Sequence, residues 1–153
     1  MLKGSTLYNI TDNATAGSKA SMAVVEFQGQ GYLPKDLALF EASEGLPPQA
    51  CRNITGPADT TKTAGVEASL DIQYVIAAGT GVPADFWLDS SGSFDLMGWA
   101  TYVEGLSNPA LVWSMSYGEG VNGGNGGTLL VYSMTLVPSM CGIFLCVFAP
   151  LDA

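Results

Sequence analysis

One stretch decides the fold of this chain: residues 66–79, which read VEASLDIQYVIAAG. Apolar residues recur in it at spacings of three and four, the period of an amphipathic helix, and Gly79 supplies a stop signal. Glu67 and Asp71 lie four residues apart, so a helix places both carboxylates on one face. The stretch therefore predicts a helix that presents a pair of acids.

The surroundings of this pair determine its chemistry. Its expected neighbours on the helix are apolar or small: Leu70, Tyr74, Val75 and Ala78. Two carboxylates held together away from water repel, so the first proton leaves easily and the second is retained. Such a pair can share a proton near acid pH and act as a general base with its orienting partner. The alternative is a solvated acidic face near a helix end, and the spacing alone favours that alternative.

The remaining segments alternate between strand and helix patterns. Buried strands are expected within residues 21–27, 85–88 and 110–117, and further helices within 34–42 and 94–103. Loops are expected at 9–21 and 52–65, which are rich in turn-forming residues. The core is expected to include Trp87, Trp99 and Trp113. This order predicts an α/β domain with a mostly parallel sheet flanked by helices.

Three blocks of the sequence resemble one protein family. They are residues 67–74 (EASLDIQY), residues 107–119 (SNPALVWSMSYGE), and residues 7–10 (LYNI) with 23–27 (AVVEF). Their order and rough spacing are similar to those of the sedolisins, which are serine-carboxyl peptidases. The resemblance implies that residues 1–119 are the N-terminal part of a peptidase domain, and that the fold is a partial subtilisin-like one.

The resemblance also implies roles for particular residues. Glu67 would take the proton from a nucleophilic serine, and Asp71 would orient Glu67. Glu26, at the end of the first strand, would extend the carboxylate network, or would be a solvated strand-end acid. The strand end that pairs with the backbone of a peptide substrate would be formed by Ser116, Tyr117 and Gly118.

Two parts of the family's machinery have no match in this sequence. The nucleophilic serine should stand in a Gly-Thr-Ser segment, and the 153 residues contain none. Thr135 stands about where the oxyanion-stabilising aspartate should be. The family's calcium site would lie in an absent C-terminal part, so no cofactor or metal is expected here. The resemblance therefore implies an acid-acting, tripeptidyl-peptidase-like chain that is inactive alone. The alternative is a non-catalytic remnant that binds peptides or is tethered to a membrane.

The sequence changes character after Glu119. Residues 120–127 read GVNGGNGG, which is typical of a flexible loop, and residues 128–151 carry no charge. About 20 apolar residues suffice to cross a bilayer. Pro138 and Gly142 interrupt this run, however, and no basic flank orients it. We therefore expect residues 128–153 to be a divergent apolar tail rather than a membrane anchor.

Charge and residue usage narrow the range of partners. A net charge of −9 with five basic residues leaves no cluster that could neutralise phosphates, so we expect a peptide partner and no nucleic acid. The absence of histidine excludes a Ser-His-Asp triad and the usual histidine-containing zinc sites within this chain. The three cysteines form no metal-ligand pattern: Cys51, Cys141 and Cys146.

The sequence also bears on location. The first residues contain no apolar segment of the signal-peptide type. Three N-glycosylation sequons nevertheless begin at Asn9, Asn13 and Asn53, and they favour the secretory route. We expect a lysosomal or secreted glycoprotein whose signal peptide and propeptide are not present in this sequence.

Overall fold

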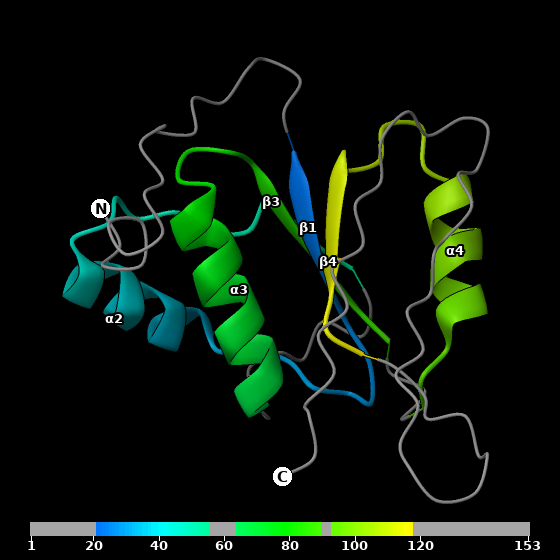
Figure 1. Ribbon diagram of the computed structural model, residues 1–153, viewed down its shortest axis with the longest axis horizontal. Helices are drawn as coiled ribbons and strands as arrows, with labels where there is room; N and C mark the ends of the chain where they lie inside the picture. Colours follow the sequence, from blue (N-terminus) through cyan, green and yellow to red (C-terminus); the bar gives the residue numbers. More distant parts are fainter. Residues whose placement is uncertain (1–20, 56–63, 90–92, 118–153) are drawn as a thin grey trace, which may run out of the picture.

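The computed structural model describes residues 21–55, 64–89 and 93–117, which form four strands and three helices (Figure 1). In chain order these are β1 (Met22–Glu26), α2 (Pro34–Glu44), β2 (Asn53–Thr55), α3 (Val66–Ala78), β3 (Ala84–Leu88), α4 (Leu96–Glu104) and β4 (Val112–Met115). The strands form one parallel sheet in the order β2-β3-β1-β4. The predicted α/β class with a parallel sheet is confirmed.

Helices cover both faces of this sheet, so the two inner strands, β1 and β3, are largely buried on both sides. Helices α2 and α3 lie on one face, where they pack against alternate residues of β1 and β3, including Val24 and Phe86. Helix α4 lies on the opposite face, where Trp99 packs against Trp113 with ring centroids 5.6 Å apart. Figure 1 shows this layering, with α2 and α3 to the left of the strands and α4 to the right. The three tryptophans predicted as core are buried: Trp87, Trp99 and Trp113.

Helix α3 ends at the predicted glycine: the N–H of Gly79 still donates to the Val75 carbonyl at 2.9 Å, but its backbone, with φ −105° and ψ 40°, is no longer helical. Its buried side is made of Ala68, Ile72, Ile76 and Ala77. Leu70 and Tyr74 are instead 47% and 55% exposed, so the prediction that they shelter the acids from solvent is wrong. The reason is that three buried residues spaced by four, at positions 68, 72 and 76, turn the helix toward β1 and β3.

A strand within the predicted loop at 52–65 is a second correction. Asn53–Thr55 pairs in parallel with β3, and the partners are Asn53 with Asp85, Ile54 with Phe86 and Thr55 with Trp87. Three residues show too little periodicity to predict a strand, and this one forms because β3 offers it hydrogen-bonding groups.

The connection through α3 has an unusual hand. From β1 the chain passes through α2, on the first face, to β2 at one edge of the sheet. From β3 it passes through α4, on the second face, to β4 at the other edge. Because both the direction and the face are reversed, these two crossovers have the same hand. The chain passes from β2 back to β3 with α3 on the first face, so this crossover has the other hand. Because about 98% of such connections are right-handed, the pair that agrees is right-handed and the α3 crossover is left-handed.

Several predictions concern residues outside the described ones: the glycine-rich loop 120–127, the tail 128–153, Asn9, Asn13 and Gly118. Among the residues that the structure does describe, no helix is both long enough and apolar enough to cross a bilayer.

The orientation of α3 can be tested by truncating one residue on each side of it. Ile72→Ala should lower the free energy of unfolding by about 2–5 kcal/mol, because Ile72 has no exposed surface and its loss leaves a cavity. Leu70→Ala on the same helix should cost much less, since Leu70 is about half exposed. Urea denaturation followed by tryptophan fluorescence measures both, and equal losses would contradict the orientation.

Candidate active site

Five of the residues singled out in the sequence come together where the parallel strands end. Glu26 is the last residue of β1, Ser116 and Tyr117 directly follow β4, and α3 brings Glu67 and Asp71 to the same place. In open α/β sheets, the carboxyl ends of the strands are where ligand and catalytic sites form. The sixth residue, Gly118, lies outside the described residues.

The link between the helix and the last strand is a hydrogen bond. The Ser116 hydroxyl donates to Oδ2 of Asp71 at 2.7 Å. A hydroxyl that donates to a carboxylate favours its charged form and fixes its orientation. Ser116 therefore holds Asp71 toward the end of β4.

The central acid of the cluster is Glu26, whose side chain is completely buried. The Tyr117 hydroxyl lies 2.9 Å from Oε2 of Glu26 and 3.2 Å from the carbonyl oxygen of Phe27. A phenol has a single proton to donate, so it cannot serve both acceptors fully. If Glu26 is protonated, its own O–H can donate to the Tyr117 oxygen, and the phenol can then donate to Phe27. The geometry thus favours a neutral Glu26.

Electrostatics favours the same protonation state. Burial, followed by the nearby charge of Asp71, raises the pKa of Glu26 from 4.5 to about 9. Its other oxygen, Oε1, is buried and has no hydrogen-bond partner in the described part of the chain. An ionised carboxylate would be costly in that position. Glu26 is therefore the member of the cluster that keeps its proton over the acid and neutral range.

The two helix acids are more accessible, and their pKa values are also raised. Burial raises the pKa of Asp71, and the hydrogen bond from Ser116 opposes that rise. Burial raises the pKa of Glu67, and the charge of Asp71 adds to the effect. Glu67 lies in the first turn of α3, where the helix dipole favours the charged form of an acid and therefore acts against these two causes.

These features give the cluster a definite chemical capacity. The two acids of α3 titrate above their ordinary values and lie beside a third acid that stays protonated. Such a group can take up a proton at acid pH and pass charge among its members, as a general base requires. Leu70 and Tyr74 are not the cause of these raised pKa values, because both side chains are about half exposed.

The sequence did not reveal how Ser116 and Tyr117 connect to the acids. Successive strand residues point to opposite faces, so Ser116 projects toward α3, while Tyr117 packs edge-on against Phe27 with ring centroids 5.1 Å apart. A hydroxyl at each of two consecutive positions after a buried strand was the available signal. This signal could be interpreted only once the fold showed that Asp71 and Glu26 lie next to these two hydroxyls.

Other chemistries find less support within the described residues. No group of three or more histidine, cysteine, aspartate or glutamate side chains there could hold a metal ion. Burial raises the pKa of the Cys51 thiol to about 11, which disfavours the nucleophilic thiolate.

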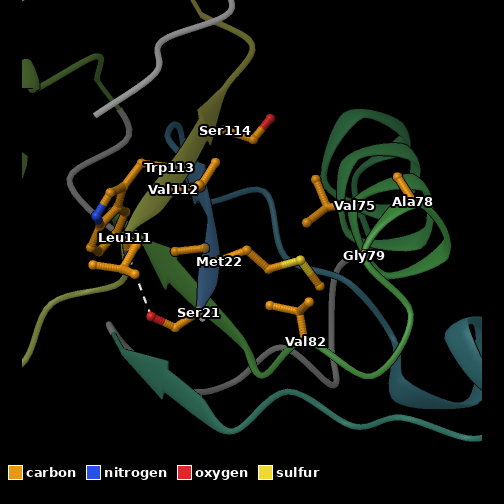
Figure 2. Close-up of a pocket in the computed structure, with 11 residues that line it drawn as sticks. Ser21, Met22, Val75, Ala78, Gly79, Val82, Leu111, Val112, Trp113 and Ser114 are labelled. Atoms are coloured by element: carbon orange, nitrogen blue, oxygen red, sulfur yellow. Dashed lines mark hydrogen bonds between the residues drawn. The ribbon is translucent and has the colours of Figure 1, made fainter. Parts of the chain in front are cut away.

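A separate apolar hollow of about 510 Å³ lies at the other end of the strands (Figure 2). It is bounded by the starts of β1 and β4 and by the end of α3, including Met22, Val112 and Gly79. The side-chain hydroxyl of Ser21 accepts a hydrogen bond from the Leu111 N–H at its rim. None of the described residues that line it is ionisable, so those residues offer no group for acid-base chemistry.

The protonation of Glu26 predicts that the fold is more stable in acid. Below pH 4.5 the folded and unfolded chains both hold this proton. Between 4.5 and about 9 the folded chain retains it while the unfolded chain releases it, so stability falls as the pH rises. Urea midpoints measured from pH 4 to 9 should decline, and Glu26→Gln should flatten the decline.

The control for this experiment is Glu44→Gln, since Glu44 is exposed at the end of α2. It should leave the pH dependence of the parent unchanged. A decline that persists in Glu26→Gln would show that another group is responsible.

Comparisons with known proteins bear on the family of this chain. No family model matches the chain. It is 36% identical over 106 residues to Tripeptidyl-peptidase 1 of Dictyostelium discoideum, an alignment that covers 65% of this chain and 17% of that protein. It is 31% identical over 113 residues to Physarolisin of Physarum polycephalum, covering 73% of this chain and 19% of that protein.

The chain thus spans less than a fifth of the length of these two relatives. The similarity extends over roughly two thirds or more of the chain itself in both alignments. These similarities establish that the chain is a relative of the sedolisin family of peptidases.

Proposed function

We propose that this chain supplies the acidic residues of the active site of a sedolisin-type serine peptidase. The enzyme would remove short peptides at acid pH in the manner of a tripeptidyl-peptidase. The observation that carries the proposal is the hydrogen bond from Ser116 to Asp71 at the strand ends, with Glu67 and the buried Glu26 beside it. The similarity to peptidases of this family supports the proposed reaction class.

In this proposal Glu67 is the general base. It is partly exposed, so its carboxylate can be reached by a serine hydroxyl from elsewhere in the protein. A base works best when its pKa lies near the operating pH, and burial together with Asp71 moves Glu67 upward from the usual range of an acid. Asp71, held by Ser116, orients Glu67 and stabilises the proton that Glu67 takes up.

Glu26 has a supporting role. Because burial keeps it protonated, it adds no negative charge beside Asp71 at acid pH. Asp71 can then stay ionised while Glu67 cycles between its two states. A second buried anion at this position would raise the pKa of both helix acids further and reduce the fraction of active base.

The end of β4 is the proposed substrate strand. β4 is the last strand of the described sheet on its side, and a peptide could add to it in extended form through backbone hydrogen bonds. Tyr117 is anchored by Glu26 and by Phe27, which fixes the direction of the chain as it leaves the strand. Gly118 would allow the substrate backbone to approach closely.

The proposal also places the protein in lysosomes or outside the cell, because an acid-acting peptidase with N-glycosylation sequons suits those compartments. We propose a peptide as its partner, with no role for nucleic acid or for a membrane anchor in residues 128–151. The proposed mechanism requires no metal at the cluster of Glu26, Glu67 and Asp71.

The 153-residue chain alone should show no peptidase activity. It contains no Gly-Thr-Ser segment, and members of a catalytic triad act non-additively, so a base without its nucleophile gives little acceleration. The assay is hydrolysis of a tripeptide amide with a free amino terminus at about pH 4, the ordinary range of these acids. Turnover that disappears in Glu67→Gln would contradict this, because a serine of this chain would then be the nucleophile.

A chimera tests whether the carboxyl cluster is catalytic. Residues 21–117 would replace the matching segment of Dictyostelium Tripeptidyl-peptidase 1, and the chimera should cleave that enzyme's substrate. Glu67→Gln should lower kcat by about 10²–10⁴-fold, the usual contribution of a general base, and Asp71→Asn should also lower it severely. Glu44→Gln is the matched control on an exposed acid and should leave kcat unchanged.

A further inference from the structure

The sequon Asn53-Ile54-Thr55 coincides with β2, whose bounds are the same three residues. It is the one of the three sequons that falls within the described residues. β2 is the end strand of the described sheet, with β3 on one side and no strand on the other. Asn53 is exposed, so its amide group can be reached from solvent.

The contacts of Asn53 are compatible with a sugar on its side chain. Its Nδ2 donates one hydrogen bond to Oδ1 of Asp85 at 2.9 Å. An asparagine amide carries two N–H donors, and an N-linked sugar replaces only one of them. The bond to Asp85, which Arg52 also pairs with, can therefore persist in the modified protein.

The surface around Asn53 offers a place for the first sugar. A hollow of about 530 Å³ lies on the α4 side of β2 and β3, and Asn53, Thr55, Trp87 and Tyr102 contribute to its lining. Aromatic rings in such a wall give the apolar face of a sugar ring something to pack on. The Tyr102 hydroxyl donates to Oγ1 of Thr55 at 2.9 Å, which holds α4 beside the sequon.

We propose that Asn53 is N-glycosylated and that its glycan covers the open β2 edge of the sheet. In the reaction a bond forms between Nδ2 of Asn53 and the anomeric carbon of N-acetylglucosamine. The bond from that carbon to the diphosphate of a lipid-linked oligosaccharide breaks, and the diphosphate leaves while the amide loses a proton. The glycan then shields the outward N–H and C=O groups of β2, through which an edge strand can pair with another chain.

The inference rests on the secretory location given under the proposed function, and the other two sequons separate the two claims. The protein recovered from the cells that make it would be denatured, treated with a peptide N-glycosidase in heavy-oxygen water, and then cut with trypsin. Asn53 is the only asparagine of the tryptic peptide 53–62, and Asn9 and Asn13 lie in peptide 4–19. Conversion of Asn53 to isotopically labelled aspartate is the expected result.

Each other result overturns the proposal in a distinct way. Label in peptide 4–19 without label at Asn53 would refute the Asn53 glycan while leaving the secretory location intact. Absence of label from both peptides would refute the glycan and count against the location as well.

Matched variants separate the modification from the fold. Thr55→Ser keeps both the sequon and a hydroxyl acceptor for Tyr102, so it should retain the glycan. Asn53→Gln and Thr55→Ala should each lose one glycan by mass. The glycan-free forms should scatter more light at equal protein concentration than the parent and Thr55→Ser, and equal scattering would refute the role of the glycan at the edge.

Discussion

Burial of the Glu26 carboxyl group is the constraint on which the rest of the site depends. A side chain with no exposed surface at the end of the central strand must either be neutral or be matched by a partner charge, and the described cluster contains only acids and hydroxyls. Protonation satisfies this requirement and leaves Tyr117 able to donate to the Phe27 carbonyl. The state of one buried acid thereby determines how much negative charge the two acids of α3 experience.

Much of the fold could be predicted from the sequence, because its signals are local. The spacing of apolar residues along α3 and the mainly apolar sequences of β1 and β4 depend on neighbours in the chain. The strand β2 could not be predicted, because a three-residue edge strand exists only through its pairing with β3. Whether Leu70 or Ile72 faces the core was equally hidden, since it depends on which face of the sheet the helix meets.

The candidate site could also be predicted only in part. The pair formed by Glu67 and Asp71 was visible as a four-residue spacing, and their roles came from the family resemblance. The contact between Ser116 and Asp71 joins residues 45 positions apart, and that between Tyr117 and Glu26 joins residues 91 apart. No local pattern encodes such distances. They are set by the parallel register of β1 with β4 and by the position of α3 above β1.

The left-handed crossover through α3 has a consequence for how this chemistry can change. With the usual hand, the same helix would lie on the α4 side of the sheet, and the carboxylate of Asp71 would be separated from Ser116 by the thickness of the strands. Side-chain substitutions can remove the acids or restore them, but none can carry the helix through the sheet to the other side. The contact between Asp71 and Ser116 therefore depends on the path of the backbone. A related protein has this contact only if it shares the same crossover.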